Sequence, residues 1–585
     1  MYNLLKKHKD KSPELTIQEI RQILGELEIF TNEIDWYSAS NHCHSVRLID
    51  SEIPDGRIGT NGKGVSRIWA LASAYGEFME RLQNEMLYTR HFGLMDDDVF
   101  YPDEKLLKMQ TIIENNHNIF CEFSDDDKEE LIKYRAYANS VPYLHLNKNK
   151  VEYLPICILR SMTGSTGMCA GNTASEALLQ GLCEIFERYA LKQIVLHDFA
   201  TPTIPNSVIK NYNTQKLFND FSQQGFSFQF KDCSLDDFIP VVAIIIYNDD
   251  FSKYRVNIGA DPVFEIALER CITEINQGTN ALDRAMIPID LSIPFSNQQK
   301  LAEFNNAKHT GTGQILNTFF RNGKNSKKSK IFHNNFINNN ESLNFFLQNL
   351  MNKGYNIYIR DVSFLNFPAY HIFIPEMSIN RKYDNSFIIQ RIIKETLLNL
   401  NSCSREKLRG CLPFLEFHVG DESLNMDLFK KLFNITIDKS SQLNELEITY
   451  ILSLICIKLE DYKKAFKYLS IYLKDNHSQF ENTRYGMCCL FYLKLKSENY
   501  SEDKIRDNID DIFGNELTNE VISDMKNTDD IFTNLNLPVC GDCISCSIRE
   551  ECYYDRWKQV RNRVKIEMKK NLIDQRHLMN FRVNK

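Results

Sequence analysis

Apolar residues recur along this chain in two rhythms, one typical of helices and one typical of strands. A spacing near 3.6 residues from about residue 14 to 29 predicts an amphipathic helix. Apolar runs at 71–82 and 177–191 predict two more helices. Strands are predicted at three places, 240–247, 355–361 and 370–375. Strands mixed with long helices indicate α/β or α+β architecture, and we expect an α+β fold of mixed sheets and helices.

The strand signals stop near residue 400, which divides the chain into a mixed domain and a helical remainder. Around Leu459–Tyr468 the pattern resembles the helix–turn–helix of a tetratricopeptide repeat. The predicted parts are a mixed α+β domain at 1–400 with a flexible insertion at 321–344, a linker at 401–439, a helical domain at 440–535 and a cysteine-rich, basic module at 536–585.

Composition is that of an ordinary globular protein, with 43% hydrophobic and 25% charged residues. A net charge of −8 argues against direct nucleic-acid binding. The N-terminus lacks the apolar core of a signal peptide, and no run reaches membrane-spanning length. Sixteen cysteines without an export signal predict reduced thiols and a cytoplasmic location, with no membrane partner.

Polar side chains form narrow stripes on three helices that are otherwise apolar. The first stripe is Ser73, Glu77, Glu80 and Arg81; the second is Glu176, Gln180, Glu184, Glu187 and Arg188; the third is Glu269, Arg270, Glu274 and Gln277. Residues three and four apart share one helix face. An exposed helix often carries such residues as surface ion pairs, and for one stripe alone that is the better interpretation. Three stripes together favour a composite site.

Carboxylates among Leu, Ile and Phe are costly to bury unless a cation satisfies them. Mg²⁺ bound to nucleotide phosphates is the natural candidate, because it takes carboxylate and phosphate oxygens. Gly62 and Gly64 precede the first helix and allow close backbone approach, and Lys63 between them is placed to meet phosphate. His42-Cys43-His44 makes a poor metal corner, because adjacent side chains point apart.

The three stripes resemble the motifs of the YcaO family, ATP-binding proteins that act on peptide amides, over about residues 1–400. This resemblance implies the site residues. Those implied to bind ATP are Lys9, Thr16, Ser73, Arg81, Gln180, Arg188, Arg270 and Gln277. Those implied to bind Mg²⁺ are Glu77, Glu80, Glu176, Glu184, Glu187 and Glu274. Where the family's namesake has Gln-Gly-Arg, this chain has Gln277-Gly278-Thr279, so one phosphate-side cation is missing.

The resemblance also implies a chemistry, the phosphorylation of an amide oxygen after a nucleophile has added to the carbonyl. For stand-alone members it implies a role accessory to methylthiolation of an aspartate in a small-subunit ribosomal protein, beside a radical-SAM methylthiotransferase. One alternative is an azoline- or thioamide-forming enzyme of peptide maturation, although the end Asn580–Lys585 lacks the proline-rich tail of azoline formers. Another is a non-catalytic, ATP-bound scaffold. A homodimer is among the oligomeric states considered.

Four cysteines near the C-terminus have the spacing C-x₂-C-x₂-C-x₅-C: Cys540, Cys543, Cys546 and Cys552. Structural zinc usually takes two C-x₂-C pairs separated by a longer loop. Successive x₂ steps are typical of cysteines around an iron–sulfur cubane. We therefore expect a [4Fe–4S] cluster, with Zn²⁺ as the alternative and unmetallated thiols as the third interpretation.

Overall fold

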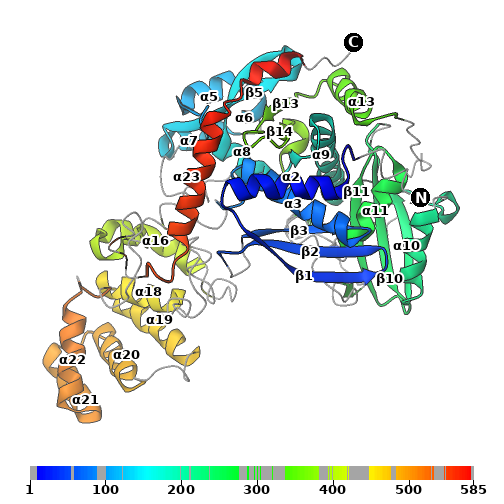
Figure 1. Cartoon of the computed structure of the whole chain (residues 1–585). Helices are drawn as coiled ribbons and strands as arrows, with labels where there is room; N and C mark the ends of the chain where they lie inside the picture. Colours follow the sequence, from blue (N-terminus) through cyan, green and yellow to red (C-terminus); the bar gives the residue numbers. More distant parts are fainter. Residues whose placement is uncertain are drawn as a thin grey trace. The chain divides into compact units, whose positions relative to one another are not determined.

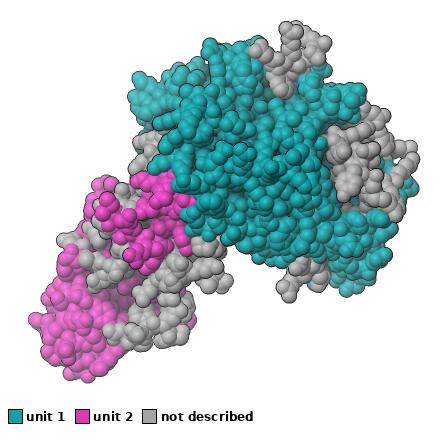
Figure 2. All heavy atoms as spheres, in the orientation of Figure 1, with its two compact units in different colours: residues 1–88, 99–383, 560–585 teal, residues 89–98, 384–559 magenta. Residues whose placement is uncertain are grey.

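The computed structural model covers the whole chain and describes most of it. The described residues are 9–53, 58–88, 101–121, 123–197, 199, 201–209, 212–235, 238–275, 286–288, 296, 300, 304, 319, 336–380, 393, 396–397, 399–417, 419, 447–475, 483–528, 530–532, 544, 546 and 548–580. The chain divides into two compact units, which Figure 2 shows in teal (1–88, 99–383 and 560–585) and magenta (89–98 and 384–559).

Three antiparallel sheets make the framework of the first unit, as far as the described residues show. The three-stranded sheet runs β1 (Thr31–Ser40), β2 (Cys43–Asp50), β3 (Gly59–Gly64). The five-stranded sheet runs β12 (Ile287–Pro288), β11 (Lys253–Ala260), β10 (Val241–Asn248), β9 (Phe226–Asp232), β8 (Thr203–Ile204). The six-stranded sheet runs β4 (Lys105–Lys108), β5 (Tyr137–His145), β13 (Tyr358–Asp361), β14 (Ala369–Phe373), β7 (Met168–Ala170), with β6 (Lys150–Pro155) on β5.

Each of the three helices that carry the polar stripes packs against two of these sheets (Figure 1). Helix α3 (Arg67–Gln83) contacts β2 and β3 on one side and β7 and β14 on the other. Helix α9 (Ala174–His197) contacts β7 and β14, and also β10 and β11. Helix α11 (Phe264–Ile275) contacts β10 and β11, and also β2 and β3. The helices thus link the sheets in a closed cycle, which explains why each helix is apolar on more than one face.

Capping side chains lie at the first residues of helices α2, α3 and α9. Helix α2 (Pro13–Glu26) starts with Ser12 as its cap and proline at its first position, and it packs on α3. Ser66 caps α3, its hydroxyl accepting from the amide of Trp69 at 3.5 Å. Thr173 precedes α9 and accepts from the amide of Glu176 at 3.2 Å.

The remaining helices of the first unit pack on the sheets or on other helices. They are α5 (Met109–Asn115), α6 (His117–Phe120), α7 (Asp125–Tyr134), α8 (Ile156–Thr163), α10 (Tyr212–Ser222), α13 (Asn339–Asn352), α14 (Pro375–Ser378) and the 3₁₀-helices η1 (Leu146–Lys148), η2 (Asn206–Val208) and η9 (Gln575–Asn580). Residues 339–344, expected in the flexible insertion, instead begin α13, because Asn338 caps the helix and Leu343 and Phe346 enter the core. Residues 321–335 lie outside the described part of the chain.

The second unit is helical throughout its described residues. Its elements are η5 (Leu400–Ser402), α16 (Arg405–Phe417), α18 (Ile448–Lys458), α19 (Tyr462–Asp475), α20 (Thr483–Ser497), α21 (Glu502–Phe513) and α22 (Asn515–Lys526). Helices α18 and α19 pack as a pair across a three-residue turn, in which Glu460 has φ of 61°. Helix α16 lies within the stretch expected as a linker. It is a packed helix and not a linker, because Leu408, Cys411 and Leu415 are buried in the unit's core. The tetratricopeptide character of the pair stays a prediction.

The C-terminal residues return to the first unit. Helix α23 (Tyr554–Lys570) crosses the division at residue 560. Beyond it, Gln575 exchanges two hydrogen bonds with the backbone of Asp361, of 2.8 and 2.9 Å, although the two residues are 214 positions apart. Residues 560–585 therefore group with the mixed domain and not with a separate module from 536. Among the described residues, no helix combines the length and the apolar character needed to cross a membrane.

Candidate functional site

The first stripe lies on α3 and holds its two carboxylates beside one guanidinium. Arg81 makes ion pairs with Glu77 at 3.4 Å and Glu80 at 3.5 Å. Burial raises the pKa of Glu80 well above its usual range; Arg81 opposes that rise, and Glu184 on α9 and Glu77 add to it. Ser73 lies one turn before Glu77 on the same face of the helix. The charge of Glu184 on α9 thus acts on Glu80 of α3.

The middle of α9 carries two half-buried carboxylates that lack hydrogen-bond and ion-pair partners among the described residues, Glu184 and Glu187. Burial raises the pKa of Glu184, and Arg188 counteracts it. Burial, followed by the charge of Glu274 on α11, raises the pKa of Glu187 to about 8. Half-buried carboxylates without such a partner are costly, which makes Glu184 and Glu187 the candidates of this helix for holding a cation.

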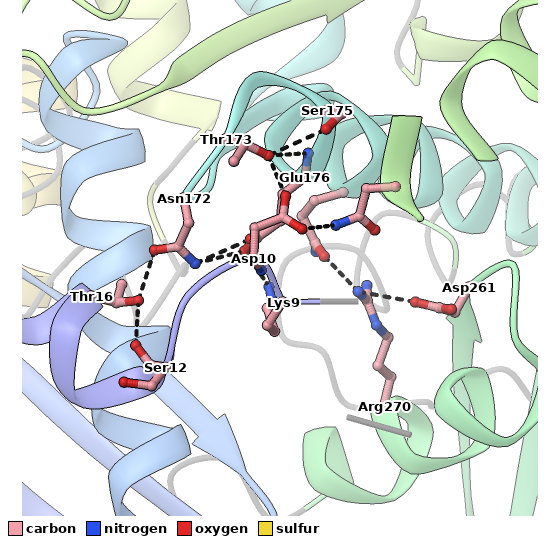
Figure 3. Close-up of polar contacts among 12 residues, drawn as sticks. Lys9, Asp10, Ser12, Thr16, Asn172, Thr173, Ser175, Glu176, Asp261 and Arg270 are labelled. Carbon is pink, nitrogen blue, oxygen red and sulfur yellow. Dashed lines mark hydrogen bonds and ion pairs between the residues drawn. The ribbon is translucent and has the colours of Figure 1, made fainter. Parts of the chain in front are cut away.

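The third stripe lies on α11, and both of its charged members inside the site are paired. Glu274 accepts from Lys63 on β3, with 2.5 Å between Oε1 and Nζ. Burial alone would raise its pKa, but Lys63, Arg188 and other cations lower it. Arg270 donates to Gln180 on α9 at 2.6 Å and makes an ion pair with Asp261 at 3.3 Å (Figure 3). Arg270 and Gln180 thus join α11 to α9.

The start of α9 is the opposite of its middle, because every acceptor of Glu176 is satisfied (Figure 3). Glu176 is 5% exposed. Its carboxylate accepts from Lys9 Nζ at 3.1 Å, from the amide of Asp10 at 2.9 Å, and from Asn172 Nδ2 at 3.1 Å to each oxygen. Burial acts to raise its pKa, but these donors, led by Lys9, lower it. In this structure Glu176 anchors the N-terminal segment, and Mg²⁺ binding by it stays a prediction.

Thr16 completes the anchor. Its hydroxyl donates to Asn172 Oδ1 at 2.7 Å, and both side chains are buried. Thr173 also hydrogen-bonds to Asp10, and Asn339 of α13 donates to the same carboxylate at 3.2 Å. Lys9 and Thr16, expected at the nucleotide, are thereby brought to the N-terminal end of α9.

The chemistry of these donors fits a Mg²⁺–nucleotide site. No group of three His, Cys, Asp or Glu side chains is already assembled as a metal cage within the described residues. Mg²⁺ is usually held by one or two carboxylates together with waters and substrate phosphates, so a preformed cage is not required. The orphaned carboxylates Glu184 and Glu187 would serve the cation, and Arg188 and Arg270 lie close enough to affect their charge.

Several residues of the site were not assigned from sequence. Asn172, Asp10 and Asp261 hold Glu176 and Arg270 in place, and their role shows only in three dimensions. Glu269, which the sequence did place in the third stripe, is half-buried, and burial raises its pKa to about 7, with Arg270 opposing the rise. The position of Asn172 next to the second stripe was the sequence signal that could have identified it as part of the site.

Some expected ligands lie elsewhere or outside the described residues. Gln277, Cys540 and Cys543 are outside them. Cys546 and Cys552 are half-buried against the core of the second unit, and Cys552 Sγ accepts from the amide of Tyr554 at 3.4 Å.

The side chains of His42, Cys43 and His44 lie in three different environments. His42 pairs with Asp220 at 2.9 Å, Cys43 is buried, and His44 bonds to Ser38 at 2.8 Å. The expectation that adjacent side chains diverge is therefore confirmed.

Two protein-family models match the chain. The first, described as YcaO cyclodehydratase, ATP- and Mg²⁺-binding, matches residues 61–378 and thus includes all three stripes. The second, described as YcaO cyclodehydratase C-terminal domain, matches residues 391–537. The first match thus covers most of the first unit, and the second match lies within the second unit.

Two relatives are similar over a large part of the chain. An uncharacterised protein of Haemophilus influenzae is 30% identical over 316 residues, 51% of this chain and 53% of its own length. The chain thus spans about half of that relative. The ribosomal protein S12 methylthiotransferase accessory factor YcaO of Escherichia coli is 27% identical over 427 residues, 68% of this chain and 71% of its own.

Solved structures show more distant likeness. A heterocyclase in complex with substrate and cofactor is 18% identical, with a TM-score of 0.46 over 63% of this chain and 53% of that chain. YcaO from Methanopyrus kandleri bound with AMPPCP and Mg²⁺ is 15% identical, with a TM-score of 0.42 over 63% of this chain and 93% of that chain. These scores are too low to transfer any residue's role.

Proposed function

The chain belongs to the YcaO family of ATP- and Mg²⁺-binding proteins, and on that premise we propose that it uses Mg²⁺–ATP to activate a protein or peptide amide by O-phosphorylation. One observation carries the proposal: Glu184 and Glu187 are half-buried and make no hydrogen bond or ion pair within the described residues, while charges from α3 and α11 act on them. Because the family binds ATP and Mg²⁺, the cation that these carboxylates would hold is Mg²⁺ bound to ATP.

The chain's own residues would act by positioning and by balancing charge. Glu184 and Glu187, with Glu80 and Glu274 beside them, would hold Mg²⁺, and Arg188 and Arg270 would balance phosphate charge. Bound ATP would supply the phosphoryl group that converts the amide oxygen into a leaving group. Preorganised charges of this kind act chiefly by electrostatic stabilisation of the group being transferred.

As the biological role we propose assistance to methylthiolation of an aspartate in the small-subunit ribosomal protein S12, beside a radical-SAM methylthiotransferase. The support is the similarity to the Escherichia coli accessory factor over 68% of this chain. Mass spectrometry of ribosomal proteins from a strain without this gene tests the role. Loss of the methylthio mass on S12, restored by the wild-type chain, is expected; an unchanged S12 mass contradicts it.

The second candidate is azoline or thioamide formation in a peptide, which the description of the family models as cyclodehydratases favours. Such an enzyme would consume ATP in proportion to a short precursor peptide, and S12 would have no effect.

A non-catalytic, ATP-bound scaffold is the third candidate. ATP turnover stimulated by any client excludes the scaffold, and the identity of the stimulating client separates the two enzymes.

We also propose that Cys540, Cys543, Cys546 and Cys552 hold a [4Fe–4S] cluster, with Zn²⁺ as the alternative. Their spacing supports the cluster. Anaerobic purification should then give a brown protein that absorbs near ~400 nm, as cysteine-ligated clusters do. A colourless preparation with stoichiometric zinc would leave a structural zinc site, and a metal-free one would leave neither.

A further inference from the structure

Lys63 reaches the site from the face of β3 that is turned away from α3. Gly62 and Gly64 face α3 so closely that a Cβ at Gly62 would lie 1.9 Å from the backbone oxygen of Ala70. Side chains alternate along a strand, so Lys63 between them points to the opposite face. That face of the three-stranded sheet packs against α11. The strand backbone is thus fixed by α3, while the lysine side chain extends toward α11.

At α11 the ammonium of Lys63 lies on Glu274, 2.5 Å from Oε1. The two side chains are 27% and 25% exposed, so the pair is half-buried. Glu274 is one of the carboxylates assigned to Mg²⁺, and its charge acts directly on Glu187. Of the described residues, Glu274 is the only one to which Lys63 makes a side-chain hydrogen bond or ion pair.

An ammonium and Mg²⁺ compete when both need the same carboxylate oxygen. We propose that Lys63 is a built-in counter-ion of the empty site: it occupies Glu274 until Mg²⁺ arrives with nucleotide, and it then neutralises charge on the accompanying phosphates. This inference rests on the proposed Mg²⁺–ATP site. It explains how several carboxylates are kept together without metal, because one of them is already neutralised by a movable cation.

The exchange gives the site a preference for the metal–nucleotide complex over the bare metal. Bare Mg²⁺ would have to displace Lys63 from Glu274, and Glu187, the other carboxylate whose charge interacts with Lys63, is itself assigned to the metal. Mg²⁺ that arrives with phosphates brings new anions for the displaced ammonium, so the lost ion pair is replaced. Lys63 is therefore a ligand-discriminating residue as well as a phosphate contact.

Binding of Mn²⁺ as a probe of the Mg²⁺ site, followed by electron paramagnetic resonance, tests the inference on the full-length protein. For Lys63→Met, the affinity for Mn²⁺ without nucleotide should rise ~10-fold, and the affinity for Mn²⁺–ATP should fall ~10-fold, each the order of one charge-assisted pair. Lys63→Arg keeps the charge and should retain the low affinity for bare Mn²⁺. The matched control is Lys496→Met, which removes an equally half-buried lysine 2.6 Å from Glu502 in the second unit.

An affinity for bare Mn²⁺ that is unchanged or lower in Lys63→Met overturns the inference. Glu274→Gln separates that result from failure of the proposed function. If Glu274→Gln weakens Mn²⁺ binding while Lys63→Met does not strengthen it, the metal site stands and the counter-ion role is wrong. If Glu274→Gln has no effect on Mn²⁺ binding, the metal site itself is wrong at α11, and the inference falls with it. Thermal unfolding of each variant shows whether it is folded.

Discussion

The two ends of one polar stripe on α9 have opposite environments. At the start of the helix, Glu176 is buried and accepts hydrogen bonds from Lys9, Asp10 and Asn172, and its pKa is lowered. Two turns later, Glu184 and Glu187 have no such partners among the described residues, and their pKa values are raised. One stripe of acids can thus contain two kinds of residue. Glu176 is an anchor, whose acceptors are satisfied by the protein, whereas Glu184 and Glu187 are the proposed receptor, whose oxygens are left for a ligand.

Removing the receptor should have the largest effect. In Glu184→Gln/Glu187→Gln the amides keep the shape of the carboxylates but lose both charges, so Mg²⁺–ATP affinity should fall ~100-fold or more. Isothermal titration calorimetry measures the loss. Glu265→Gln, a half-buried glutamate elsewhere on α11, is the control and should bind normally. Undiminished affinity in the double variant would remove the basis for calling these residues a receptor.

Removing the anchor should chiefly affect stability. Glu176→Gln leaves Lys9 and the amide of Asp10 without their charged acceptor, so the free energy of unfolding should fall by about 2 kcal/mol. Denaturant unfolding measures that change, and faster proteolysis before Pro13 would report release of the N-terminal segment. The control is Glu14→Gln, an exposed acid in the first turn of α2. If Glu176→Gln lost Mg²⁺ binding without losing stability, the division into anchor and receptor would be wrong.

The two ends should also respond to pH in opposite directions. The pKa of Glu187 is raised to about 8, so the metal-free fold binds more protons than the unfolded chain from about pH 4.5 to 8. Its contribution to stability is therefore lost as pH rises through that window, while Mg²⁺ affinity increases because the proton must leave. The pKa of Glu176 is lowered, so its contribution is present at neutral pH and is lost as pH falls below the usual glutamate range.

Calorimetric melting of metal-free protein at several pH values measures both directions. Glu187→Gln should match wild type at low pH, where the carboxyl is protonated, and should melt higher than wild type near pH 8. Parallel curves for the two proteins across the whole range would show that Glu187 does not titrate as described.

The smallest effect is expected at Thr16. Thr16→Val keeps the shape but removes the hydroxyl that donates to Asn172, which should cost about 1 kcal/mol of stability. Thr16→Ser retains the donor and should lie closer to wild type in the same denaturant titration. A larger loss in Thr16→Ser than in Thr16→Val would mean that packing, not the hydrogen bond, matters at this position.

The sequence predicted the helices of the site well, because their acids recur on one face of an apolar helix. Helices α3, α9 and α11 follow from that helical periodicity. Strands β10, β13 and β14 follow from the separate strand pattern and lie at or close to their predicted positions. Helix α16 was missed, since its apolar face is interrupted by Gly410 and Pro413, which read as breakers.

The pairing of the acids could not be predicted, because it depends on residues far away in the chain. Lys9 and Glu176 are 167 positions apart, and Lys63 and Glu274 are 211 apart. No local pattern distinguishes Glu176 from Glu187. The return of Gln575 to Asp361, 214 positions away, is equally non-local.

One measurement tests the comparison most directly: anomalous diffraction from crystals grown with Mn²⁺ and a non-hydrolysable ATP analogue. We expect an anomalous peak within ligand distance of Glu184 or Glu187, with Lys9 still on Glu176 and Lys63 no longer on Glu274. A peak bound by Glu176, with Glu184 and Glu187 left without a cation, would contradict it.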